Sequence, residues 1–305
     1  MGTYRLTVEY DGSDFHGWQR QPGMRTVEGE LRAALARVGD ADADLNAAGR
    51  TDAGAHAHGQ VVGLRTDRNW EPESLRRALV AVLPRDVTVS AAAPAAAGFH
   101  ARRHAVSRTY RYLVVSQRTP VARRFAWEIS GEVDLEAMRG AADVLRGRHD
   151  FGAFGRSPKP GGGTVRTVHE ISVRRATSVC GGEHLPVVVI EVTADAFLYG
   201  MMRAIAGVLV AVATGRVSRE RLAAALSDPG ARPERVTVAP ARGLHQWAVT
   251  YGPTTLISTD LVVRSMLRGR RPVGPPPVPH DSALPPSAAP FLDLGDLSVV
   301  AGGDS

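Results

Sequence analysis

The N-terminal third of the chain alternates between strand and helix periodicities. Thr3–Tyr10 alternates polar and apolar residues with a period of two and ends at Asp11-Gly12, which predicts a strand and a turn. Apolar residues at three- and four-residue steps then predict an amphipathic helix over 27–38, which Thr26 can cap. The remaining elements of this part are strands at 59–64 and 87–90 and a helix at 73–83. Together they predict a β-α-β-α-β unit built on a sheet.

The middle of the chain repeats this scheme with a longer set of elements. Strands are predicted at 107–116, 165–173, 186–193 and 246–251, and helices at 134–146, 197–214 and 218–226. Two α/β halves therefore follow each other, and we expect a functional cleft between them. The first subdomain is predicted over 1–106 and the second over 107–252.

The C-terminal segment 253–305 differs in composition from the rest of the chain. Its last part, 272–305, holds eight prolines and four aspartates but no lysine or arginine. Such a composition buries too little apolar surface to order a chain, so it predicts a disordered tail with no required part in chemistry. A short element at 256–267 is left unassigned.

The charge balance favours a polyanionic partner. The 305 residues carry a formal net charge of +6, and Lys159 is the only lysine, so arginine supplies nearly all of the positive charge. Arginine pairs with phosphates through two parallel hydrogen bonds and stacks on bases, which suits RNA. A genome-wide bias toward arginine and alanine codons explains the same composition, so the charge alone leaves the partner open.

Cysteine usage and hydropathy favour a cytoplasmic protein without a membrane segment. Cys180 is the only cysteine, which excludes an intrachain disulfide and a cysteine-based metal cluster and fits a reducing compartment. The N-terminus has the pattern of a strand and lacks the apolar centre of a signal peptide. The longest apolar stretch, 197–214, contains Arg203 near its start and predicts a buried helix rather than a membrane span.

One acidic residue is distinguished by its setting. Asp52 lies between Gly49 and Gly54 and follows Arg50 closely. Glycines permit tight turns and close approach to a ligand, and cationic neighbours favour the ionised carboxylate that a nucleophile requires. Asp52 is therefore a candidate catalytic carboxylate. The alternative is an ordinary turn in which its side chain accepts hydrogen bonds from nearby backbone amides.

Arg203 is the second unusual charge, because the predicted helix around it is otherwise apolar for more than a dozen residues. Burying an unpaired charge costs several kcal/mol, so we expect a carboxylate partner. Asp52 is the best candidate, since such a pair would favour its ionised form. In the alternative, Arg203 extends from the start of the helix to solvent with its stem on apolar surface.

Weaker patterns do not support metal or phosphate-loop chemistry. His56 and His58 share a face of a strand, but neither His100 nor His104 completes a convincing ligand spacing, so no metal is expected. The run Gly161-Gly162-Gly163 lacks the Lys-Ser/Thr pair and the helix context of a phosphate loop. We interpret this run as a flexible connector.

A series of short motifs resembles the tRNA pseudouridine synthase A family. In chain order they are Tyr10-Asp11-Gly12-Ser13, Gly17-Trp18-Gln19-Arg20-Gln21, Gly49-Arg50-Thr51-Asp52-Ala53-Gly54, Gly59-Gln60-Val61-Val62, Leu83-Pro84, Phe99-His100-Ala101-Arg102, Tyr110-Arg111-Tyr112, Asp150-Phe151, and Ala196-Phe197 followed by Met202-Arg203. They are spread over residues 4–251, about four fifths of the chain, and keep the order of the family. Chance explains a single six-residue match but not this ordered series.

The resemblance implies a fold and a set of site residues. The implied fold is α+β, with two related α/β subdomains whose mixed, largely antiparallel sheets join around a basic active-site cleft. Asp52 matches the catalytic aspartate of the family, and Arg203 matches the arginine that pairs with this carboxylate. Tyr110 matches a tyrosine that stacks on the target base and serves as a general base. Strand alternation places Tyr110 and Tyr112 on the same face, so the spacing alone does not choose between them.

The same resemblance points to residues that would bind RNA. Taking a stacked base out of RNA costs a few kcal/mol, which arginine and aromatic side chains can offset by filling the vacated space. Arg50 matches an arginine linked to RNA binding and to displacement of the target nucleotide. The residues expected to bind substrate or RNA are Arg50, Trp18, Arg20, Arg102, Arg108 and Leu244. For any single arginine, an ordinary solvated surface position is the alternative.

The activity implied by the resemblance is the conversion of uridine to pseudouridine in the anticodon stem-loop of tRNA. The resemblance also implies a homodimer without a metal or organic cofactor. Two alternatives remain open: a divergent member acting on another RNA or on a free uridine nucleotide, and an RNA-binding module without catalysis. The matches at Asp52, Tyr110 and Arg203 argue against the second alternative.

The chain departs from the family pattern at a few positions. Val82 stands where the family often has an asparagine, and Ala204 replaces the asparagine that commonly follows the arginine. The segment Ala196–Arg203 lacks a histidine that commonly precedes the methionine and arginine, and the closing motif 243–247 is less aliphatic than usual. These departures bear on the identity of the substrate more than on the chemistry.

Overall fold

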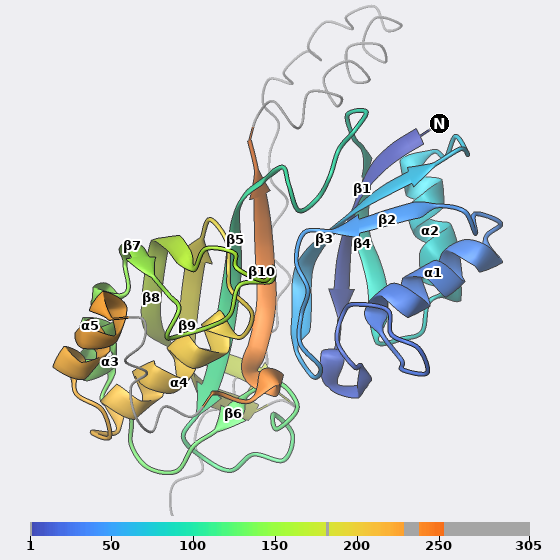
Figure 1. The fold of residues 1–305 in the computed structure, drawn as a ribbon. Helices are drawn as coiled ribbons and strands as arrows, with labels where there is room; N and C mark the ends of the chain where they lie inside the picture. Colours follow the sequence, from blue (N-terminus) through green and yellow to red (C-terminus); the bar gives the residue numbers. More distant parts are fainter. Residues whose placement is uncertain (1, 181–182, 229–237, 253–305) are drawn as a thin grey trace, which may run out of the picture. The chain divides into compact units, whose positions relative to one another are not determined.

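The structure is a computed structural model in which residues 2–180, 183–228 and 238–252 are described (Figure 1). The chain divides into two units after residue 264, and every described residue lies in the first. The predicted tail at 253–305 and the unassigned element at 256–267 fall outside the described residues.

A single ten-stranded sheet runs through the described residues (Figure 1). Its strand order is β4-β1-β3-β10-β5-β9-β8-β7, with β2 paired to β3 and β6 paired to β5. The pairs β3–β10 and β5–β6 are parallel, and the other described pairs are antiparallel. The strands are Gly2–Tyr10 (β1), Asp44–Ala47 (β2), His56–Thr66 (β3), Val87–Pro94 (β4), Ala105–Val115 (β5), Trp127–Glu128 (β6), Gly147–Asp150 (β7), Val165–Cys180 (β8), Glu183–Ala194 (β9) and Leu244–Tyr251 (β10). The predicted α+β class with a mixed, largely antiparallel sheet is confirmed.

Five α-helices accompany this sheet in the described part of the chain. They are Val27–Arg37 (α1), Pro72–Val82 (α2), Leu135–Val144 (α3), Met201–Ala213 (α4) and Arg219–Ser227 (α5), with two short 3-10 helices at Gly12–Asp14 (η1) and Ala241–Gly243 (η2). Helices α1 and α2 lie beside β1–β4, whereas α3, α4 and α5 lie beside β5 and β7–β9 (Figure 1). Among the described residues, no helix combines the length and the apolar character needed to cross a membrane.

Local sequence signals explain where these helices begin. The predicted N-cap of α1 is confirmed, because the Thr26 side chain accepts a hydrogen bond from the Gly29 amide. Helix α2 begins at Pro72, whose missing N–H is not needed at this position, and the Glu71 side chain accepts from the next free amides. The helix predicted over 197–214 begins only at Met201. Gly200 has a left-handed φ of 78°, which a continuous helix cannot contain.

Each half of the sheet has its own hydrophobic core. In the N-terminal half, Leu31 of α1 and Leu75 of α2 pack in one fully buried cluster with Leu6 and Val62 of the sheet. In the C-terminal half, side chains of α3, α4 and α5 form a second cluster with β5, β8 and β9, whose members include Met138, Ile205, Leu222, Tyr112 and Ile190. One sheet passes through both halves, and the predicted division at residue 106 stays a prediction.

The two halves meet where β3 pairs with β10. This parallel pairing, called the seam below, consists of His245 opposite His56 and Gln246 opposite Ala57. Strand β10 also pairs antiparallel with β5, where Gln246 lies opposite Tyr110. The last described strand therefore lies in the centre of the sheet (Figure 1).

Candidate active site

The loop that carries Asp52 connects β2 to β3 and is held by the segment after β1. The Trp18 amide donates to the Thr51 carbonyl at 3.1 Å, and the Thr51 and Tyr10 hydroxyls share a buried hydrogen bond of 2.8 Å. Gly17, next to Trp18, has a φ of 86°, and a Cβ at this position would lie 2.7 Å from the Thr51 carbonyl oxygen. The loop therefore has a fixed position because backbone and side chain both bind its Thr51.

The Asp52 carboxylate forms an ion pair across the seam with Arg203 of α4. Arg203 Nη1 donates to Asp52 Oδ2 at 2.8 Å, and Arg203 Nε donates to the Ala239 carbonyl at 2.7 Å. Both side chains are mostly buried, with exposed fractions of 24% for Arg203 and 13% for Asp52. The predicted pairing is confirmed, whereas the alternative of an arginine extended to solvent is wrong. The Asp52 carbonyl does accept from the Ala55 amide in a local turn, but the carboxylate binds Arg203.

Tyr110 lies beside this pair, and Tyr112 does not share its environment. A Cβ on Gly49 of the Asp52 loop would lie 3.2 Å from the Tyr110 hydroxyl. The Tyr110 ring contacts Phe197 edge-on, with 4.7 Å between ring centroids. The Tyr112 hydroxyl instead donates to the Pro240 carbonyl at 2.6 Å inside the core. Of the two tyrosines, Tyr110 is therefore the one whose hydroxyl lies against the Asp52 loop.

Burial changes the acidity of Tyr110. Loss of hydration raises the pKa of its hydroxyl to about 12, and the nearby Asp52 carboxylate acts in the same direction. The Arg108 guanidinium opposes this shift but is the smaller effect. Tyr110 is therefore a neutral phenol at neutral pH.

Two buried glutamines link the Asp52 loop to β10. Gln246 Nε2 donates to Gln60 Oε1 at 3.0 Å, and Gln60 Nε2 donates to the Gly49 carbonyl at 2.9 Å. Both side chains belong to fully buried residues. Neither glutamine was expected at the site from the sequence. A polar amide among the apolar residues of a predicted strand was the available signal, because a buried amide requires partners.

The residues expected to bind RNA fall into two groups. Arg50, Arg20 and Arg102 are exposed and free to reach a ligand. Trp18 and Leu244 are buried, with exposed fractions of 3% and 6%.

Arg108 is also buried, and its guanidinium donates to the carbonyls of Ala105, Asp195 and Arg102. Because these N–H groups of Arg108 already donate to backbone carbonyls, fewer of them are available to bind a phosphate.

The histidines at the seam are neutral and stacked. His56 Nδ1 accepts from the Gly12 amide, while its Nε2 lies 2.9 Å from the Arg124 carbonyl and donates there. Burial lowers the pKa of His56, and it lowers the pKa of the neighbouring His245 to about 3. Their ring centroids are 4.7 Å apart. Within the described residues, no group of three or more His, Cys, Asp or Glu side chains is arranged to hold a metal ion.

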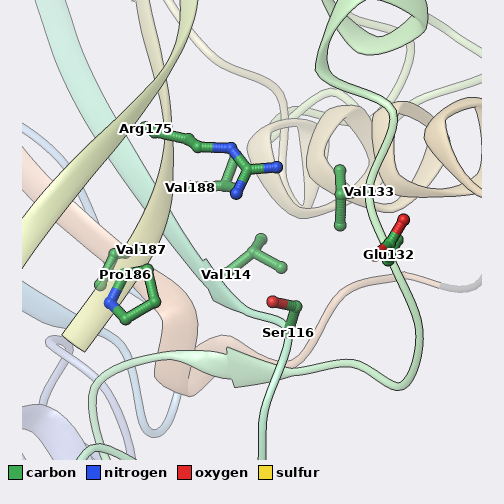
Figure 2. A pocket seen from close by; sticks show the side chains of 8 residues that line it. All are labelled: Val114, Ser116, Glu132, Val133, Arg175, Pro186, Val187 and Val188. Atoms are coloured by element: carbon green, nitrogen blue, oxygen red, sulfur yellow. The ribbon is translucent and has the colours of Figure 1, made fainter.

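A cavity of about 230 Å³ lies away from Asp52, at the ends of β5 and β9 (Figure 2). Arg175 reaches over Val188 on one side, and Glu132 lies on the other. The residues that line it are Val114, Ser116, Glu132, Val133, Arg175, Pro186, Val187 and Val188. None of the candidate catalytic residues belongs to this lining, so the cavity does not locate the reaction.

Comparison with known proteins gives the family. The family model described as tRNA pseudouridine synthase matches residues 6–102 and 141–252. The tRNA pseudouridine synthase A of Methylobacterium sp. (strain 4-46) is 39% identical over 254 residues, 82% of this chain and 98% of the relative. The enzymes of the same name from Roseiflexus sp. (strain RS-1) and Methylacidiphilum infernorum are 40% and 41% identical, each over 82% of this chain and over 91% and 96% of their own lengths. The chain therefore belongs to the tRNA pseudouridine synthase family and is an RNA-modifying isomerase.

Proposed function

We propose that this enzyme converts uridine to pseudouridine in the anticodon stem-loop of tRNA, with Asp52 as its catalytic carboxylate. The observation that carries the proposal is the bond from Arg203 Nη1 to Asp52 Oδ2, which joins residues 151 positions apart beside Tyr110. A carboxylate held in this way is oriented before substrate arrives.

Each of the three residues has a distinct part in the proposed reaction. Asp52 attacks the ribose C1′ or the base C6, or abstracts a ribose proton, after which uracil detaches, rotates and rejoins through C5. The base gains a proton at N1, and the proton at C5 is lost to water. Arg203 stabilises the Asp52 carboxylate through Oδ2, and Oδ1 meets the nucleoside. Tyr110 stacks on the uracil. Its raised pKa favours this stacking role over removal of the C5 proton at neutral pH.

The exposed arginines supply the RNA contacts in this proposal. Arg50 precedes Thr51 and Asp52 in the loop and fills the space that the flipped nucleotide leaves, while Arg20 and Arg102 contact phosphates. Trp18, Arg108 and Leu244 shape the site from buried positions. A homodimer in the cytoplasm, working without a metal or organic cofactor, completes the proposal and follows the family resemblance.

Release of tritium from C5-labelled uridine in tRNA tests the role of Asp52. The Asp52→Ala variant should lose at least about a thousandfold in rate, because the attacking group is gone, while tRNA affinity stays within about threefold. Asp44→Ala is the matched control, since it removes another carboxylate–arginine pair, Asp44–Arg65 at 3.1 Å, outside the site. Its rate should equal that of the unmodified enzyme.

The same assay separates the alternatives. Release from labelled UMP but not from tRNA would identify a nucleotide isomerase, and release from a different RNA would change the substrate. Binding of tRNA without release from any of these substrates would leave an RNA-binding module. Full activity of Asp52→Ala would contradict the assignment of the catalytic carboxylate.

A further inference from the structure

The catalytic residues come from opposite sides of the seam. Asp52 belongs to the half of the sheet that contains β3, whereas Tyr110 and Arg203 belong to the half that contains β10. The backbone pairing that joins the two halves consists of two residue pairs. A small shift between β3 and β10 would therefore change the distances among the reacting groups.

Gln246 contacts both sides of this junction. It lies opposite Ala57 of β3 and opposite Tyr110 of β5, so its backbone is part of the seam and of the strand pair that carries Tyr110. Its side chain donates to Gln60, which in turn donates to the Gly49 carbonyl. Gly49 belongs to the Asp52 loop. The two bonds thus connect the strand beside Tyr110 to the loop of Asp52.

Distances around Gly49 show how close these groups are. A Cβ on Gly49 would lie 3.2 Å from the Tyr110 hydroxyl and 3.6 Å from Gln246 Nε2. The Asp52 loop, Tyr110 and the Gln246 amide therefore meet around one glycine. Loss of the Gln246–Gln60 hydrogen bond would therefore affect the position of Gly49 directly.

The energetics of Gln246 are unfavourable for a purely structural role. Its Oε1 is buried and has no hydrogen-bond partner among the described residues. An unpaired buried polar atom destabilises the fold, and a leucine of similar size would remove this atom but would leave Gln60 Oε1 without its donor. The amide is therefore best explained by the geometry that its Nε2 bond imposes.

We propose that Gln246 is a positioning residue, which sets the Asp52 carboxylate against Tyr110 through Gln60 and Gly49. This inference rests on the proposed catalytic role of Asp52. It predicts that loss of the Gln246–Gln60 bond slows the chemical step more than it weakens tRNA binding. A misplacement of about 1 Å at a reacting group can reduce a rate about a hundredfold.

The test compares Gln246→Leu with a matched control in single-turnover tritium release from tRNA. Thr66→Val is the control, because it removes the buried bond of 2.7 Å from Thr66 to Asp40 within the N-terminal half. Both variants should lower the melting temperature. Gln246→Leu should reduce the single-turnover rate about 10- to 100-fold at saturating tRNA with KM within about threefold, whereas Thr66→Val should keep the rate.

Gln246→Glu provides a second measurement that also serves if Gln246→Leu does not fold. A protonated glutamic acid can donate to Gln60 Oε1, but a carboxylate cannot. The rate of Gln246→Glu relative to the unmodified enzyme should therefore rise as the pH is lowered, with melting temperatures recorded at each pH.

The outcomes are separable. A Gln246→Leu rate within twofold of the unmodified enzyme, or for Gln246→Glu a relative rate independent of pH, would overturn the positioning role. The proposed function would still stand after such a result, provided that Asp52→Ala is inactive in the same assay. Full activity of Asp52→Ala would instead remove the basis of both proposals.

Discussion

At the scale of single residues, Gly17 shows how a position outside the Asp52 loop constrains the site. Its φ of 86° is accessible to glycine at little cost, and its missing side chain lets the backbone of Trp18 bind Thr51. Asp52 follows Thr51 directly. The position of the carboxylate therefore depends on a glycine in another loop.

Gly17→Ala should cost about 2–4 kcal/mol in the free energy of unfolding, because a left-handed alanine adds strain and its Cβ would meet the Thr51 carbonyl at 2.7 Å. Gly23→Ala is the matched control. Gly23 also has a positive φ, of 71°, but a Cβ added there would meet no heavy atom within 4 Å, so about 1–2 kcal/mol is expected. Chemical denaturation measures both values. The rate of pseudouridine formation should fall in the first variant only, and equal rates would contradict the dependence of Asp52 on Gly17.

At the scale of elements, the seam between β3 and β10 is held by neutral histidines as well as by the glutamines. His245 Nε2 donates to the Phe125 carbonyl at 2.8 Å, and its ring stacks between His56 and His58. Burial lowers the pKa of His245 to about 3 from an ordinary value of 6.5. The folded protein therefore binds this proton less readily than the unfolded chain does.

The stability of the enzyme should fall in acid for this reason. Between pH 6.5 and about 3, His245 is protonated in the unfolded chain but stays neutral in the folded protein. The free energy of unfolding therefore decreases as the pH falls through this range. His245→Phe keeps an aromatic ring but removes the titrating group, and its loss of stability on acidification should be smaller. Denaturation curves at several pH values between 7 and 4 check the difference in slope. Parallel slopes would contradict the role of His245.

The elements also show which parts of the fold are predictable from the sequence. Thr26 and the apolar positions of α1 are local signals, so the helix and its cap were predicted correctly. The strands β2 and β7 are not predicted from the sequence, because four residues are too few to establish a periodicity. The predicted helix begins at residue 197 rather than at Met201, because the apolar pattern extends to Phe197. The positive φ of Gly200 prevents a continuous helix over these residues.

Some contacts of the candidate site are likewise predictable from the sequence, and others are not. The pairing of Arg203 with Asp52 is predictable, because a charge in an apolar helix needs a carboxylate and the glycine-bounded loop distinguishes Asp52 from the other acidic residues. The Gln60–Gln246 bond was not, because it joins residues 186 positions apart and depends on the register of a parallel strand pair. The resemblance placed Tyr110, and only the structure distinguished its surroundings from those of Tyr112.

At the scale of the whole molecule, the family match and the described strands end together. The match ends at residue 252, and β10 ends at Tyr251. The first compact unit extends to Arg264. The chemistry proposed above uses no residue beyond this unit.

A chain ending at Arg264 should therefore keep the rate of tritium release from tRNA within about twofold. A second chain, ending at Gly252, tests whether 253–264 supports the fold, and its melting temperature reports the answer. A large loss of rate in the first chain, with its melting temperature unchanged, would assign the segment 265–305 a part in RNA binding or catalysis.

The central place of β10 has a consequence for the order of events during synthesis. Strands β3 and β5 leave the ribosome long before residues 244–251, yet the parts of their edges that pair with β10 stay unpaired until this strand inserts between them. Unpaired edges are prone to associate with other chains, so the nascent protein passes through a period of exposure that ends with its last described strand. Gln246 arrives with that strand. A chain that stops before β10 lacks both this central strand and Gln246, so we expect tritium release from tRNA only after translation has passed β10.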